Sequence, residues 1–173
     1  NSGETLKLGF DDLSAELENY SYTFIHCNAN WEPSDLMSSE FIDGFADNSM
    51  TEYHYSRNTI QKYIHYNATF PTNSTRFTKS GNYILKVYKD NDPDDLVLTR
   101  RFMISDNKVN ITGRVAAASI IADRNYKQEI DFTIEYTGYV INNPYGDLNV
   151  FLTQNNHWNN VKSGLKPVYV KDK

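Results

Sequence analysis

Acidic side chains gather at one point of the sequence, where they could bind a cation. The segment Asp90–Asp95 carries four carboxylates, and carboxylate oxygens are the ligands that Ca²⁺ prefers. It lacks the spacing, the turn glycine and the closing glutamate of an EF-hand loop. We therefore interpret it as an acidic, solvated tip of a β-hairpin, and we predict no metal site and no cofactor.

The histidines and the single cysteine are the next candidates for chemistry. His26, His54, His65 and His157 show no HExxH spacing, so no two of them are predicted to bind zinc from one helix face. His54 and His65 would meet only if they lay on neighbouring strands. Cys27 excludes both an intramolecular disulfide and a multi-cysteine zinc site. Because it stands in an apolar, strand-like run, we expect a buried and inert thiol.

Nucleophilic catalysis finds no support in the sequence. There is no Gly-x-Ser-x-Gly elbow. Cys27 and His26 are adjacent, but neighbouring strand residues point to opposite faces and cannot pair directly. Nothing in the sequence singles out two of the 22 acidic residues as the catalytic pair of a glycosidase. We predict no catalytic residues, and a hydrolase is the weakest of three functional hypotheses.

Exposed aromatic side chains point instead to binding. The segment 31–45 is long for a connection between strands, and long loops in compact domains are often functional. It carries four large apolar residues, which we predict to bind a partner: Trp31, Leu36, Phe41 and Phe45. The alternative is that half of them cover the open end of a β-sandwich. A sugar-stacking platform on Trp31 or Trp158 is a further hypothesis.

These side chains must be positioned by β-strands, because alternation with period two recurs along the chain. In Glu129–Tyr136, apolar residues alternate with polar ones, which predicts a half-buried antiparallel strand. Asn82–Lys89 and Leu96–Ile104 flank the acidic turn and predict a hairpin. In this hairpin Tyr83, Leu85 and Val87 share one side, and Leu96, Leu98, Phe102 and Ile104 are in register.

The remaining segments complete an all-β prediction. The other expected strands are Thr5–Phe10, Asn19–Cys27, Thr51–Tyr55, Tyr63–Phe70, Val109–Ile121, Leu148–Gln154 and Pro167–Val170. One short helix is expected within Ser34–Phe41. The turn spacing is typical of tandem immunoglobulin-like antiparallel β-sandwiches, the second being incomplete or minimal. We place the first domain at residues 1–105 and the second at residues 106–173.

Composition narrows the class of protein. A net charge of −5 without a basic stripe disfavours nucleic-acid binding and a polybasic membrane anchor. No apolar run approaches the length of about 18 residues that suggests a transmembrane helix. Four Asn-x-Ser/Thr sequons begin at Asn19, Asn67, Asn73 and Asn110, but the chain holds 20 asparagines, so chance accounts for them. The chain begins at Asn1 rather than Met and ends abruptly at Lys173, so we expect it to be part of a longer protein.

Longer strings of residues resemble a known family. The strings are Ser21–Cys27 with Trp31–Leu36, Arg76–Tyr83, Leu98–Phe102, Asp123–Phe132 and Asn143–Leu148. Together they cover most of the chain and resemble the type IX secretion system plug protein family.

The resemblance implies a Bacteroidetes source and an exported, periplasmic protein associated with the outer membrane through a protein partner. It implies a non-enzymatic plug that closes the periplasmic end of the outer-membrane translocon barrel. Family members extend beyond this chain, and the resemblance transfers no catalytic or metal-binding residue. The rival hypothesis from another class is a carbohydrate-binding or adhesive β-sandwich module.

Overall fold

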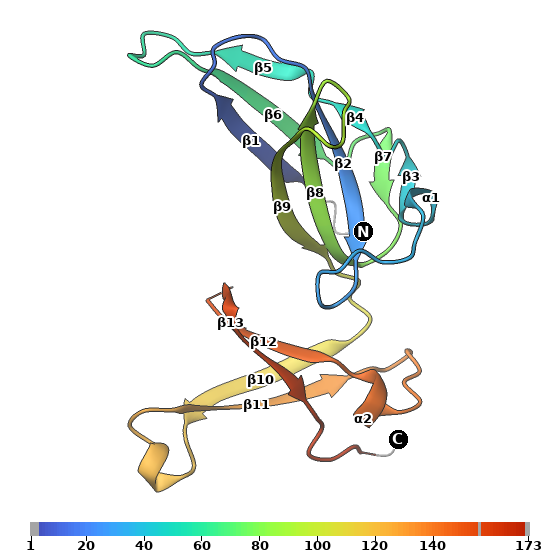
Figure 1. The fold of residues 1–173 in the computed structure, drawn as a ribbon. Coiled ribbons are helices and arrows are strands. Elements are labelled where there is room, and N and C mark those ends of the chain that lie inside the picture. The colour runs from blue at the N-terminus through green and yellow to red at the C-terminus, as the bar shows by residue number, and fades with distance from the viewer. Residues whose placement is uncertain (1–3, 156, 172–173) are drawn as a thin grey trace. The chain divides into compact units, whose positions relative to one another are not determined.

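The computed structural model describes residues 4–155 and 157–171, and its chain is all-β with short helical turns (Figure 1). The predicted fold class, antiparallel and β-rich, is therefore confirmed. The chain divides into two compact units, with the boundary in the sequence after Asp106. The two sandwich domains themselves, 1–105 and 106–173, stay a prediction, and residues 1–3, 156 and 172–173 lie outside the described part.

The first unit contains three antiparallel sheets. Its strands are β1 (Leu6–Asp12), β2 (Tyr20–Cys27), β3 (Ile42–Gly44), β4 (Asn48–Ser49), β5 (Glu52–Tyr55), β6 (Ile64–Phe70), β7 (Thr75–Phe77), β8 (Gly81–Lys89) and β9 (Leu96–Ile104). One sheet has the order β1-β6-β5 and a second the order β4-β2-β8-β9, while β3 pairs with β7. The first two sheets enclose the core between them, which makes this unit a β-sandwich.

The predicted hairpin forms as β8 and β9, with the expected register except at Leu96. Tyr83 faces Phe102 and Val87 faces Leu98, and Tyr83, Leu85 and Val87 are all buried. A register shift follows Val87, so that Leu96 pairs with Tyr88. Leu96 is consequently 52% exposed, whereas Leu98, Phe102 and Ile104 are partly buried. A bulge of this kind inserts a residue and re-aims the side chains beyond it.

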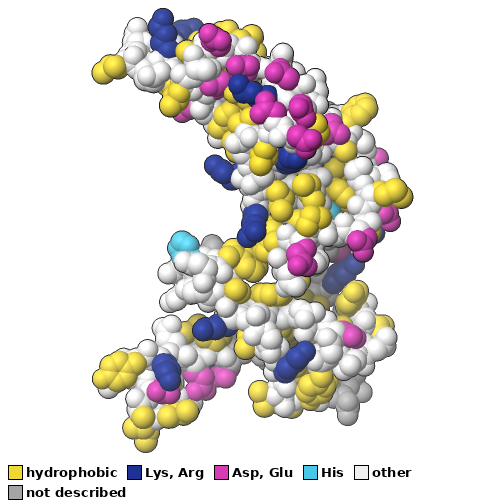
Figure 2. Space-filling model, viewed as in Figure 1, with side chains coloured by type: hydrophobic (Ala, Val, Ile, Leu, Met, Phe, Trp, Pro, Cys, Tyr) yellow, Lys and Arg dark blue, Asp and Glu magenta, His cyan; other side chains and the backbone are white. Residues whose placement is uncertain are grey.

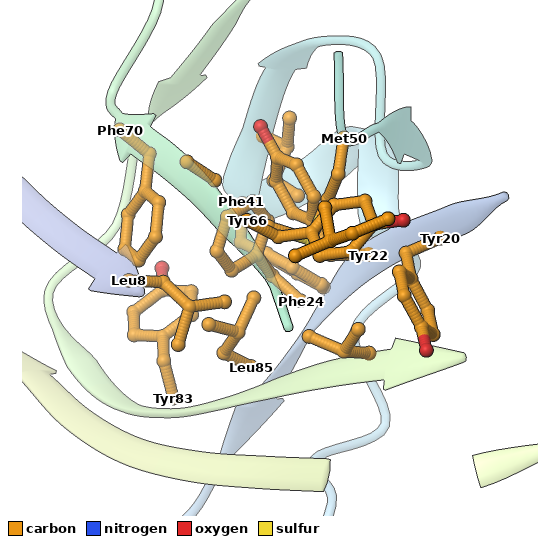
Figure 3. Packing of buried hydrophobic residues seen from close by; sticks show 14 residues of the cluster. Leu8, Tyr20, Tyr22, Phe24, Phe41, Met50, Tyr66, Phe70, Tyr83 and Leu85 are labelled. Atoms are coloured by element: carbon orange, nitrogen blue, oxygen red, sulfur yellow. The ribbon is translucent and has the colours of Figure 1, made fainter. Parts of the chain in front are cut away.

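Aromatic rings dominate the core (Figure 3). Side chains from both large sheets gather between them, among them Tyr20, Tyr22, Phe24, Tyr66 and Tyr83. Neighbouring rings adopt mostly edge-on arrangements, such as Tyr20 against Tyr66 with centroids 4.8 Å apart. Such pairs add about 0.5–1.5 kcal/mol each beyond the burial of their area. The rigidity of this unit therefore rests on tightly packed aromatic side chains.

Buried tyrosines make the first unit sensitive to alkaline pH. Burial raises the pKa of Tyr83 to about 12, and burial with a hydrogen bond to Asp47 does the same for Tyr88. Burial also raises the pKa of Tyr20, Tyr22 and Tyr66. An unfolded tyrosine titrates near pH 10. The folded form is thus favoured fully below about pH 10, and this contribution is lost as the pH rises toward about 12.

We expect the free energy of unfolding to fall by about 1.4 kcal/mol per pH unit above pH 10 for each tyrosine that stays protonated when folded. Urea titrations at a series of alkaline pH values measure this slope. Tyr83→Phe should reduce it, whereas Tyr126→Phe is the control because Tyr126 is 87% exposed. A slope unchanged in Tyr83→Phe would contradict the prediction.

The second unit consists of two hairpins. Its elements are β10 (Asn110–Ala117), η1 (Ile121–Asp123), β11 (Gln128–Glu135), α2 (Pro144–Asp147), β12 (Val150–Gln154) and β13 (His157–Leu165). Strand β10 pairs with β11 and strand β12 pairs with β13, both antiparallel. The strand predicted at Glu129–Tyr136 forms as β11, which ends at Glu135, but it is not half-buried as predicted: Ile130 is 38% exposed and Phe132 37%.

Several elements differ from the prediction. The strand expected at Val109–Ile121 ends at Ala117, because a 3₁₀ turn begins at Ile121. Pro167–Val170 is not a strand; proline lacks the N–H group that a ladder needs. The adjacent β13 was missed because its polar sequence shows no clear alternation. The short helix α2 at Pro144–Asp147 was not predicted.

The predicted helix within Ser34–Phe41 is shorter than expected. Only Ser38–Phe41 is helical, as α1. The Ser34 N–H donates to the His26 carbonyl at 2.9 Å, and the Ser34 hydroxyl lies 2.8 Å from His26 Nδ1. These contacts hold Ser34 beside the end of β2, so the helix starts later. Glu40 then accepts a hydrogen bond from the Met37 N–H at 2.8 Å and caps the first turn.

Candidate interaction surface

A rigid loop follows β2 and presents Trp31. Asn28 organises this loop: its Oδ1 accepts from the N–H groups of Asn30 at 2.8 Å and Glu32 at 3.1 Å. Its Nδ2 donates to Glu32 Oε2 at 2.9 Å. Asparagine side chains commonly satisfy turns of this kind. Asn82 on β8 donates to the Asn28 carbonyl at 3.0 Å, which ties the loop to the four-stranded sheet.

Trp31 stacks against Arg101 on β9. The guanidinium carbon of Arg101 lies 4.9 Å from the centre of the Trp31 ring, a cation–π contact. Trp31 adopts a positive φ of 68°, and its backbone N–H donates to the Asn28 carbonyl at 3.1 Å. Arg101 is paired across the sheet with Ile84, which is paired with Ile25. This row lies on the outer face of the sheet, opposite the core residues Phe24 and Leu85.

The four residues predicted to bind a partner occupy different environments. Phe41 is 3% exposed and contacts the rings of His26 and Tyr83, so it belongs to the core. Leu36 packs against that core from its edge. Phe45 is 68% exposed, and its N–H donates to the Ser74 carbonyl at 2.9 Å.

Phe41 and Leu36 therefore pack in or against the core and Phe45 is exposed, whereas Trp31 is partly buried. The structure does not bring the four together on one surface. A partner-binding role for them stays a prediction, and it now rests on Trp31 and Phe45. Sequence reasoning missed Arg101, because only the pairing of β8 with β9 places it beside the loop.

Histidines do come together on the three-stranded sheet, as the sequence left open. His54 on β5 directly faces His65 on β6, and His65 faces Asp11 on β1. His65 Nδ1 lies 2.5 Å from Asp11 Oδ1 and its Nε2 lies 3.0 Å from Asn67 Oδ1. Both ring nitrogens of His65 are thus engaged within the sheet. In the part of the chain that the structure describes, no three His, Cys, Asp or Glu side chains are grouped as ligands of one ion.

The acidic turn and the cysteine behave as expected. Residues 90–95 are exposed, and Asp90 and Asn91 have positive φ values of 49° and 57° in the turn between β8 and β9. Ser21 donates to Asn91 Oδ1 at 2.7 Å, which anchors the loop to β2. Cys27 is buried, and burial raises the pKa of its thiol. The predicted exposure of the turn and the predicted burial of the cysteine are confirmed.

The fold and this surface define an all-β protein built from antiparallel sheets, with its polar groups largely satisfied in strands and turns. Residues 1–106 match the family described as the type 9 secretion system plug protein 1st domain. The chain therefore belongs to the type 9 secretion system plug protein family.

The chain is also similar to the solved structure of a hypothetical protein from Parabacteroides merdae ATCC 43184, with 30% sequence identity and a TM-score of 0.91. The match covers 98% of this chain and 43% of that chain, so this chain spans less than half the length of that protein. No curated protein matches significantly. Among the described residues, no helix is long and apolar enough to cross a membrane.

Proposed function

We propose that this protein is a periplasmic plug that occludes the periplasmic end of the outer-membrane translocon barrel. The match of residues 1–106 to the plug family carries this proposal. The protein acts by steric contact, without catalysis, and it associates with the outer membrane through the barrel. The packed aromatic core of the first unit supports the role, because a plug must resist deformation when it fills an opening.

The Trp31–Arg101 pair is the contact that we assign to the barrel. Tryptophan and arginine are enriched among residues that dominate binding energy in protein interfaces. The two side chains already stack on each other, so they lose less conformational entropy when they bind. Phe45, exposed after β3, supplies a second apolar contact.

A tagged copy should recover the translocon barrel from detergent-solubilised envelopes. We expect Arg101→Ala to weaken this binding by about 2 kcal/mol or more, since arginine is enriched among the few interface residues whose truncation costs this much. Arg57→Ala is the matched control, because Arg57 is exposed in the loop between β5 and β6. Deletion of the gene should make the outer membrane leakier. A tight membrane and a tagged copy that recovers no translocon would together refute the proposal.

The carbohydrate-binding hypothesis gains no specific support. Arg101 covers one face of the Trp31 indole, where a sugar ring would otherwise stack. The Trp158 ring lies beside Phe151, with centroids 6.2 Å apart. A glycan-array signal that is saturable and lost in Trp31→Ala would favour this hypothesis over the plug.

A further inference from the structure

The hairpin of β10 and β11 has two faces of opposite character. Residues that are paired across the hairpin project to the same side. Ile111 faces Ile134, and Val115 faces Ile130. Phe132 lies between them, so one face is apolar along its length.

The other face is polar, and its groups bind one another. Thr112 is paired with Thr133, and Arg114 is paired with Asp131. Arg114 and Asp131 form an ion pair at 3.2 Å. This face is typical of a surface that meets water, whereas the first face is typical of a surface that meets a core.

The apolar face is nevertheless open. Ile111 is 61% exposed, Val115 59%, Ile130 38% and Phe132 37%. Among the described residues of the second unit, only Ala118 is a buried hydrophobic residue. Hydrophobic side chains of this unit reach the surface in Figure 2. Contiguous apolar surface of this kind marks a site that another surface covers.

The strand edges are also unsatisfied. β10 and β11 form a two-stranded sheet, and each strand is eight residues long. The outer side of each strand therefore has no strand neighbour among the described residues, which leaves backbone N–H and C=O groups available for pairing. A lone hairpin is at best marginally stable in water, and it gains independent stability when further strands or a packed layer cover it. Strands can satisfy both features, because they can pair with the open edges and cover the open face.

We infer that additional β-strands of the same polypeptide, outside residues 1–173, pair with this hairpin and cover its apolar face. The structurally similar protein matches nearly all of this chain yet has more than half of its own length outside the match. Strands in the same chain are present at high effective concentration, which favours them over a second copy. The apolar face also predicts the sequence of these strands: apolar and polar residues should alternate, with the apolar side chains directed toward Ile111, Val115 and Phe132. The inference is independent of the proposed plugging role.

Amide hydrogen exchange, read by mass spectrometry, tests this inference. The full-length gene product is compared with the 173-residue chain at equal concentration. We expect the peptides that cover β10 and β11 to exchange about tenfold or more slowly in the full-length product, because paired edges and a covered face protect their amides. Peptides that cover β8 serve as the internal reference, since that strand is already in the core of the first unit.

Two variants of the full-length product locate the protecting contact. Val115→Lys places a charge in the covered face and should abolish the slower exchange of β10 and β11. Thr133→Lys places the same charge on the opposite, polar face and should leave it unchanged. If Val115→Lys does not fold, the comparison of the two wild-type chains still decides the question.

Three results would overturn the inference. The first is equal exchange of β10 and β11 in both chains. The second is that the 173-residue chain becomes more protected as its concentration rises and shows the mass of a dimer in light scattering. This result would mean that a second copy covers the face. The third is a gene product with no residues beyond these 173.

Discussion

Phe24→Ala should lower the free energy of unfolding of the first unit by about 3–5 kcal/mol. Phe24 is 3% exposed and lies at the centre of the aromatic core. Its ring centroid is 4.9 Å from that of Phe77, 5.1 Å from Phe70 and 5.9 Å from Phe102. Truncation removes these contacts and leaves a cavity that rings held by separate strands cannot close. The loss is a large share of the roughly 5–15 kcal/mol that stabilises a typical domain.

Urea unfolding followed by Trp31 fluorescence in a Trp158→Phe background reports on the first unit alone. Phe45→Ala is the matched control: it makes the same chemical change at a side chain that is 68% exposed. We expect that control to stay within about 0.5 kcal/mol of the parent protein. Equal losses in the two variants would show that Phe24 is not central to the packing.

Gly44→Ala should be the most damaging of the conservative substitutions. Gly44 ends β3 with a φ of 109°, a conformation that side chains rarely tolerate. A Cβ atom there would lie 2.0 Å from the backbone oxygen of Ser74 and 2.8 Å from its carbonyl carbon. The backbone conformation alone costs about 1–3 kcal/mol, and the clash adds to this cost because a backbone atom cannot rotate away. The pairing of β3 with β7 should therefore open.

The same urea titration measures this effect, and hydrogen exchange of residues 42–44 and 75–77 locates it. Gly9→Ala is the control, because a Cβ atom there meets only the ends of the Asn67 and His65 side chains at 3.3 Å. These side chains are able to shift. Retention of parental stability and of slow exchange in Gly44→Ala would disprove the predicted clash.

Features set by local pattern could be read directly from the sequence. Period-two alternation identified β11 and the hairpin of β8 and β9, because it depends only on neighbours along one strand. The turn at residues 90–95 was equally readable, since Asp, Asn and Pro favour turns for reasons within a few residues. The family resemblance came from strings of residues and was confirmed over residues 1–106.

Local pattern could not predict which loop residues are buried. Phe41 and Phe45 are the same residue type in one short segment, yet Phe41 is 3% exposed and Phe45 is 68% exposed. The difference arises because His26 and Tyr83, from strands far away in the sequence, close around Phe41. The candidate site was therefore only half predictable.

The all-β class, the main hairpin, the buried cysteine and the family could all be predicted from the order of the residues. The contact of Trp31 with Arg101, the pairing of His54 with His65 and the open apolar face of β10 and β11 became visible only in the folded chain. Alternation assigns side chains to the two faces of a strand. Which face is covered, and by what, depends on the strands that arrive from elsewhere in the chain.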